Sequence, residues 1–339
     1  MLLLHTINNT NRKVYIARCI VIRMIDSIKE LEMIKSNDSH LEHERAKFLS
    51  VCSNFIDDTM SDSPYLEGRP KFPIKDILKA LSIQTLNGLS FRRAESDLLL
   101  AKTLGCLNTI PKKSTLSKYM NDKSLTEELE RLIQLCAIPF FGSEEKLIVD
   151  STWFAIKMYS GGHNRKPKYG KPDDQANIPS MEKCKKLHIA CLPNSKIIAY
   201  AKATSGTTHD CPLFNEIIST VYDNGFIPDK CLADAGYLSK DNYALCQELG
   251  IKQSFIDFKS NITGKHPKSQ AFRDAFHLYK HEHNIWHEDY RYRVLIESVN
   301  SVIKRKFLTW LRTKTDTARD NEILLKALCY NLLILTRYS

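Results

Sequence analysis

From residue 146 onward, the chain alternates between short apolar runs and amphipathic segments. Five apolar runs have the length of strands and lie at 146–150, 187–192, 197–203, 230–234 and 251–258. Segments with the periodicity of helices follow at 210–222, 239–249 and 316–336. Two adjoining strands joined by a turn, followed by strands and helices in alternation, predict a mixed α/β sheet with helices on its faces.

Two of the apolar runs end in a carboxylate, Asp150 and Asp234. At such a position the strand is buried while the carboxylate emerges at the rim of the sheet. If the two strands are neighbours, the carboxylates lie close together, which is costly unless a cation bridges them. Asp257, near the end of the run 251–258, is an alternative ligand.

A third group of polar residues falls in the segment 290–304. Tyr290, Arg293, Glu297 and Lys304 lie within an arc of about 60° if the segment is one helix. Such a stripe is often only the solvated face of an amphipathic helix. Its functional interpretation is that Glu297 holds a metal ion while the phenol and the two cations hold phosphates. Together with the two aspartates, Glu297 would form a site for two Mg²⁺ ions about 4 Å apart, because hard divalent ions prefer oxygen ligands.

Charge supports an anionic partner. The chain of 339 residues carries a net charge of +10, and 43% of it is apolar. The part after Ser143 holds 29 basic against 22 acidic residues, so most of the positive charge lies there. A basic protein of this kind commonly binds nucleic acid.

The ten cysteines include no C-x-x-C pair. Cys184, His188 and Cys191 resemble a metal pattern, but they fall in a strand and are interpreted as core residues. Reduced thiols and the lack of an apolar run long enough to span a membrane predict a cytoplasmic, nucleoid-associated protein without membrane contact.

The N-terminal part is predicted to be helical throughout. Residues 1–65 have no recognisable chemistry, and 66–143 contain three short helices, the second capped by Ser90 and the third by Ser114. Asn87 and Gly88 close the first of the three. These helices resemble a helix-turn-helix, with a simple packing bundle as the alternative. Its candidate DNA contacts are Lys112, Lys113 and Lys118.

The combination of motifs resembles the DDE transposases of bacterial and archaeal insertion sequences over residues 66–336. The first aspartate follows the strand Leu-Ile-Val, and the second lies in Leu-Ala-Asp-Ala-Gly-Tyr. Tyr290, Arg293, Glu297 and Lys304 match the Y-x2-R-x3-E-x6-K signature at every position.

This resemblance implies a ribonuclease-H-like catalytic domain at 144–339, preceded by the helical regions 1–65 and 66–143. It implies metal-dependent cleavage and transfer of DNA strands at terminal inverted repeats. Asp150, Asp234 and Glu297 would be both the catalytic residues and the ligands of two Mg²⁺ ions, with Mn²⁺ as a substitute.

The expected partner is double-stranded DNA, both element ends and target, bound by a homodimer on paired ends. The candidate DNA contacts of this part are Tyr290, Arg293, Lys304, Arg305, Lys306, Arg165, Lys166 and Lys168. Two alternatives remain open: a ribonuclease-H-like nuclease without joining activity, and an inactive DNA-binding relic of a transposase.

Overall fold

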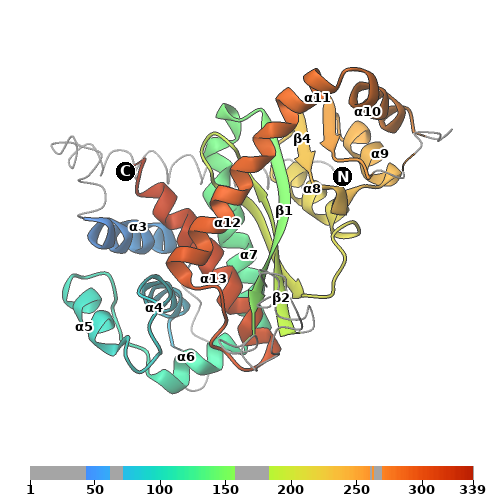
Figure 1. The fold of residues 1–339 in the computed structure, drawn as a ribbon. Coiled ribbons are helices and arrows are strands. Elements are labelled where there is room, and N and C mark those ends of the chain that lie inside the picture. Colours follow the sequence, from blue (N-terminus) through green and yellow to red (C-terminus); the bar gives the residue numbers. More distant parts are fainter. Residues whose placement is uncertain (1–42, 62–71, 157–182, 260–261, 263–268, 339) are drawn as a thin grey trace, which may run out of the picture.

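A five-stranded mixed sheet organises the C-terminal part of the chain in the computed structural model, which describes residues 43–61, 72–156, 183–259, 262 and 269–338 (Figure 1). The strands are β1 (Lys146–Ala155), β2 (Cys184–Cys191), β3 (Ile198–Ser205), β4 (Lys230–Ala233) and β5 (Gln253–Ile256). Their order is β3-β2-β1-β4-β5. The first three pair antiparallel, whereas β1, β4 and β5 run parallel. The predicted mixed α/β sheet is therefore confirmed.

The parallel half of the sheet forms because its strands are apolar on both faces. Leu147, Ile148 and Val149 of β1 are fully buried, as are the apolar residues of β4. Near-continuous apolar runs are typical of strands covered by helices on both sides. This arrangement buries the strand interiors and leaves their ends as the places where polar side chains can act.

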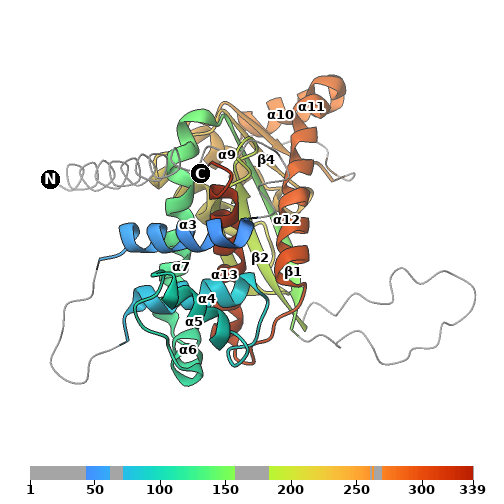
Figure 2. The same ribbon diagram turned by 90° about the vertical axis from the view of Figure 1, so that its left-hand side faces the viewer.

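Helices surround the sheet. In chain order they are α7 (Lys123–Ala137), α8 (Leu213–Asp223), α9 (Lys240–Glu248), α10 (Gln270–His281), α11 (His283–Tyr290), α12 (Val294–Phe307) and α13 (Asp316–Leu335). Helices α7 and α13 pack on β3, while α9, α10 and α11 pack on β5. Helix α12 crosses β1, and Figure 2 shows it running beside that strand.

Helix α13 connects the sheet to the N-terminal helices. Nearly every residue from Ile323 to Leu335 is buried, as expected for a helix that is covered all round. Its buried polar residues each reach another element. Asn331 accepts from Ile198 N at 2.9 Å and donates to Ile198 O at 2.8 Å. Asn321 donates to the backbone carbonyls of Met120 and Asp122. These amides satisfy backbone groups that burial would otherwise leave without partners.

The N-terminal elements described are all helices: α3 (Glu44–Thr59), α4 (Ile74–Leu86), α5 (Glu95–Thr103), α6 (Lys113–Met120) and the short 3-10 helix η1 (Ile138–Ser143), with α7 between the last two. Helices α3, α4 and α6 pack on α13. Helix α4 ends at Asn87 and Gly88 as predicted, with Gly88 at φ 58°.

Two predicted caps were wrong. Helix α5 begins only at Glu95, after a turn in which Arg93 N and Ala94 N bond to the carbonyl of Ser90. Helix α6 begins at Lys113, so Ser114 lies inside its first turn. Neither helix has a side-chain cap: a backbone turn precedes α5, and the extended residue Lys112 precedes α6. Among the residues described, no helix combines the length and the apolar character needed to cross a membrane.

Candidate active site

Three aspartates stand at one level of the sheet in three neighbouring parallel strands. The register pairs Val149 of β1 with Ala233 of β4, and Ala233 with Ile256 of β5. Asp150, Asp234 and Asp257 directly follow these partners. The first two strands are thus neighbours, as the sequence required. One detail of the prediction was wrong, because β1 continues to Ala155 and Asp150 lies within it.

Asp150 is buried and electrostatically coupled to the other carboxylates. Its exposed fraction is 9%. Its pKa is raised from 3.8 to about 6, mainly by burial and also by the charges of Asp234 and Glu297, against the opposing effects of a hydrogen bond from the Ser151 backbone and the charge of Arg293. The residues predicted to form the acidic site therefore influence one another across the sheet and α12.

Glu297 faces a cation rather than the aspartates. It lies in the first turn of α12, its side chain is 55% exposed, and Arg293 Nη2 contacts its Oε1 at 2.9 Å. Within the described part of the chain, no three His, Cys, Asp or Glu side chains converge as metal ligands. A three-carboxylate cluster therefore requires the Glu297 side chain to move towards the aspartates.

The predicted polar stripe is not part of one continuous helix, so that expectation was wrong. Tyr290 ends α11, Arg293 ends the 3-10 helix η4 (Arg291–Arg293), and Glu297 and Lys304 lie in α12. Successive side chains in a 3-10 turn are rotated by about 120° about the helix axis, against 100° in an α-helix. The sequence spacing of the four residues therefore no longer places them all on one face. The guanidinium of Arg293 nevertheless lies 5.8 Å from the centre of the Tyr290 ring.

The cations of this stripe interact electrostatically with the carboxylates of the acidic site. Burial lowers the pKa of Arg293, but Tyr290 and the carboxylates of Asp150, Glu297 and Asp234 outweigh it and raise that pKa above its usual value. Burial lowers the pKa of Lys304, against an opposing contribution from Asp150. A half-buried guanidinium and a half-buried ammonium beside carboxylates can bind phosphate oxygens.

Asn300 is a site residue that the sequence interpretation missed. It is buried on α12, and its Nδ2 donates to Asp150 Oδ2 at 3.2 Å. It lies three residues after Glu297 and so on nearly the same side of the helix, which is the signal that could have revealed it. This contact connects α12 directly to the carboxylate of β1.

A second missed group surrounds Tyr237, in the 3-10 helix η3 (Ala235–Tyr237) after β4. Its hydroxyl is buried and has no hydrogen-bond partner among the described residues. Burial raises its pKa well above the usual value, and the charges of Asp210, Asp150 and Asp234 add to this effect. A Cβ placed on Gly236 would lie 2.9 Å from Asp234 Oδ1 and 3.1 Å from Asp210 Oδ2, so the site has no room for a side chain there.

Asp210 precedes α8, but its side chain does not cap that helix. The helix begins at Leu213, and Asp210 Oδ1 instead lies 2.6 Å from Lys186 Nζ and 3.3 Å from His188 Nδ1. Burial lowers the pKa of His188 to about 4. The ion pair with Lys186 and the contact with the neutral imidazole of His188 fix the Asp210 carboxylate, and both Asp210 and Asp234 lie against Gly236.

The other residues predicted to contact DNA differ in their exposure and pairing. Lys112, Lys113, Lys118 and Arg305 are exposed, whereas Lys306 is paired with Glu44 of α3. Arg165, Lys166 and Lys168 lie outside the described residues. Glu322 accepts hydrogen bonds from Arg312 N and Thr313 N.

The fold and this site define a mixed α/β protein with carboxylates on adjacent parallel strands, flanked by cations from a crossing helix. A profile of the transposase DDE domain matches residues 142–332, more than half of the chain. The chain therefore belongs to the DDE transposases of the insertion-sequence type.

One solved structure is similar to the chain at a low level. It is a cryo-EM structure of the piggyBac transposase synaptic complex with hairpin DNA, at 11% identity and a TM-score of 0.38, covering 87% of this chain and 73% of that one. A TM-score this low does not establish a shared fold, and the classification rests on the family match. No curated protein matches the chain.

Proposed function

We propose that this transposase cleaves DNA at the terminal inverted repeats of an insertion sequence and joins the ends to target DNA. The observation that supports this most directly is the strand register that puts Asp150 beside Asp234, with α12, which carries Glu297, in contact with Asp150 through Asn300. The sheet order, with two antiparallel pairs and three parallel strands, supports a ribonuclease-H-like core. The described helices α3 to α7 precede this core, as proposed for an N-terminal helical region.

The residues fit a divalent cation. Two neighbouring carboxylates raise the pKa of the buried Asp150 carboxyl and so disfavour its charged form. A cation bound among the three carboxylates would stabilise that charged form. Asp150, Asp234 and Glu297 would hold Mg²⁺, or Mn²⁺ in its place, after Glu297 exchanges Arg293 for the metal. Bound there, two such ions would activate the attacking oxygen and stabilise the leaving oxygen of a phosphodiester.

The other side chains position the DNA and the carboxylates. Asn300 holds the Asp150 carboxylate in one orientation through its amide. Arg293, once released from Glu297, and Lys304 would bind phosphate oxygens near the scissile bond, with Tyr290 supporting Arg293 through its ring. In this proposal the Arg293 guanidinium pairs with Glu297 in the metal-free protein and with a DNA phosphate in the complex.

Duplex DNA would extend from this site towards the N-terminal helices. We propose that Lys112, Lys113 and Lys118 of a helix-turn-helix-like region contact its backbone, and that two copies act together on paired ends. Exposure of these three lysines supports the proposal.

A cleavage and joining assay tests the function. Purified protein is incubated with Mg²⁺ and duplexes carrying the inverted repeats that flank its coding region, and then with pre-cut ends plus a target plasmid. Wild-type protein should yield cut ends and joined products, and Asp150→Asn and Glu297→Gln should yield neither. Cut ends without joined product would show a nuclease, and full cleavage by Glu297→Gln would refute the assignment.

Metal binding is measured separately from cleavage. Mg²⁺ or Mn²⁺ should raise the Tm of the wild-type protein, because a ligand that binds only the folded state stabilises it. This rise should be lost in Asp150→Asn. An equal rise in both proteins would mean that the metal binds elsewhere.

A further inference from the structure

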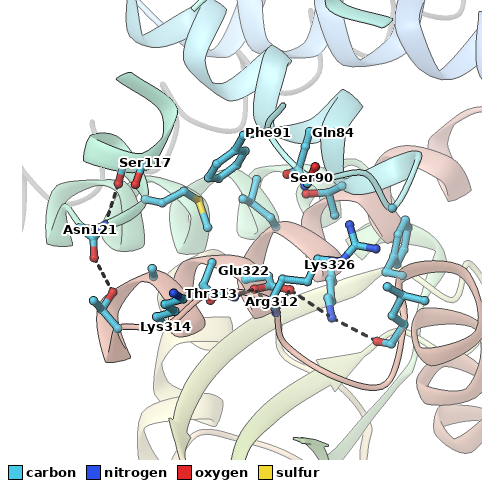
Figure 3. A pocket seen from close by; sticks show the side chains of 18 residues that line it. Gln84, Ser90, Phe91, Ser117, Asn121, Arg312, Thr313, Lys314, Glu322 and Lys326 are labelled. Carbon is cyan, nitrogen blue, oxygen red and sulfur yellow. Dashed lines mark hydrogen bonds and ion pairs between the residues drawn. The ribbon is translucent and has the colours of Figure 1, made fainter. Parts of the chain in front are cut away.

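A cavity of about 430 Å³ lies between the N-terminal helices and the connection from α12 to α13 (Figure 3). One wall comes from the end of α4, the turn after it and α6, and the other from residues 307–326. Its volume is within the range of small-molecule sites, and such sites occur preferentially between structural units.

The second wall is held rigidly by buried charges. Glu322 accepts from Thr313 N at 2.9 Å and Thr313 Oγ1 at 2.8 Å. Lys326 Nζ donates to the carbonyls of Leu308 at 3.1 Å and Trp310 at 3.0 Å. These bonds keep Leu308 at φ 71° and ψ 148°, a conformation that is costly for any residue except glycine. Strain of this kind persists only where the surroundings enforce it, and it is commonly found at ligand sites.

The lining combines apolar surface with two cations, Arg312 and Lys314, besides the paired Glu322 and Lys326. Phe91, Met120 and Phe307 supply aromatic and thioether surface. Arg312 and Lys314 are exposed at the cavity, and within the described part of the chain neither forms an ion pair. An aromatic ring with nearby cations suits a ligand that has a flat face and an anionic group.

The cavity and the acidic site share α12. Asn300, which contacts Asp150, precedes Phe307 by seven residues, which corresponds to about 10 Å along a helix. One strand of duplex DNA advances about 3.4 Å per nucleotide. A strand with a phosphodiester at Asp150 could therefore place a nucleotide about three positions away at the cavity.

We propose that this cavity holds one nucleotide with an unpaired base, the base against Phe91 and Met120 and the phosphate on Arg312 and Lys314. The inference deepens the proposed function, on which it rests for the identity of the anion. The nucleotide comes either from a single-stranded stretch of the substrate DNA or from the free pool, and both sources present the same chemistry.

The test uses fluorescence of 2-aminopurine, which stacking quenches, in EDTA so that no cleavage occurs. Three probes are compared: 2-aminopurine deoxynucleoside 5′-monophosphate, a single-stranded decamer with that nucleotide at its 5′ end, and the same decamer in a blunt duplex. Saturable quenching should occur with the decamer or with the mononucleotide, and be at least tenfold weaker with the duplex. Binding of the decamer alone assigns DNA as the source, and equal binding of the mononucleotide assigns the free pool.

Variants locate the binding. Arg312→Gln should weaken it about tenfold, because it removes a charge-assisted contact, and Phe91→Leu should weaken it similarly and reduce the quenching. Lys280→Gln removes the same charge from exposed α10, at the opposite end of the molecule, and should leave binding unchanged.

Two results would overturn the inference: no saturable quenching by any probe, or quenching that Arg312→Gln and Phe91→Leu leave unchanged. The cleavage assay separates this outcome from failure of the proposed function. Cleavage without nucleotide binding refutes only the cavity, and nucleotide binding by a protein that never cleaves refutes only the enzyme.

Discussion

Replacing Asp150 by asparagine should stabilise the metal-free protein at neutral pH. The folded state holds this carboxylate at a pKa of about 6, against 3.8 in an exposed position, because burial and the charges of Asp234 and Glu297 disfavour its ionised form. The folded state therefore binds more protons than the unfolded state between pH 4 and 6, so stability falls as the pH rises through that window. Above pH 6, the folded state carries the full free-energy cost of keeping the Asp150 carboxylate ionised.

The size of the effect follows from the shift. A rise in pKa from 3.8 to about 6 corresponds to about 3 kcal/mol as an upper limit at pH 7.5. At pH 4.5, where the folded carboxylate is mostly protonated, the penalty shrinks to about 1 kcal/mol. Asparagine has nearly the same shape and keeps an oxygen that can accept from Asn300. We therefore expect a gain of about 1.5–3 kcal/mol at pH 7.5, or roughly 2–5 °C in Tm.

Thermal and urea unfolding in EDTA, at pH 4.5 and 7.5, would measure this difference. Asp223→Asn is the matched control, because Asp223 is exposed at the end of α8. It should change stability little at either pH. The reasoning would be refuted if Asp150→Asn were no more stable than the parent at pH 7.5, or if its gain did not shrink at pH 4.5. Addition of Mg²⁺ should reverse the ranking, since only the carboxylate gains from the cation.

Three further substitutions test other parts of the structure. Asn331→Leu should cost about 2–5 kcal/mol in urea unfolding, because it leaves the buried N–H and C=O of Ile198 without partners, and a loss below 1 kcal/mol would contradict this role. Gly236→Ala should reduce the Tm rise produced by Mg²⁺, because its Cβ would displace the Asp234 carboxylate; an undiminished rise would show that the close contact relaxes harmlessly. Asn300→Ala should lower the rate of strand cleavage about tenfold while leaving DNA binding intact, measured by single-turnover cleavage and gel shift, and unchanged cleavage would exclude a positioning role.

Local patterns were sufficient to locate the strands and two of the carboxylates. Strands β1 and β4 are short apolar runs, and their parallel pairing puts Asp150 and Asp234 at the same level whatever the rest of the chain does. The hairpin of β2 and β3 and the last helix were also placed correctly. In each case the determining interaction is either burial of a contiguous run or pairing of strands that have few alternatives.

Local patterns failed where helix starts and side-chain partners depend on distant residues. Asp210 lies just before a helix, yet its carboxylate pairs with buried Lys186 and contacts His188 on β2 and does not cap the helix. The 3-10 turn at η4 interrupts a segment whose periodicity reads as one helix. Both outcomes follow from packing against elements that the local sequence does not contain.

The sequence by itself determined the strands, their acidic residues and the signature that places the chain in its family, because these depend on neighbours along the chain and on chemical identity. Only the tertiary structure decided that Asn300 orients Asp150, that Glu297 rests on Arg293, and that a cavity opens between α4, α6 and the connection to α13. The Asn300 contact and the cavity join residues far apart in sequence, and how the helices cross the sheet sets their geometry, which no local pattern encodes. Arg293 and Glu297 are only four residues apart, but the sequence could not say whether Glu297 pairs with this cation or with the aspartates.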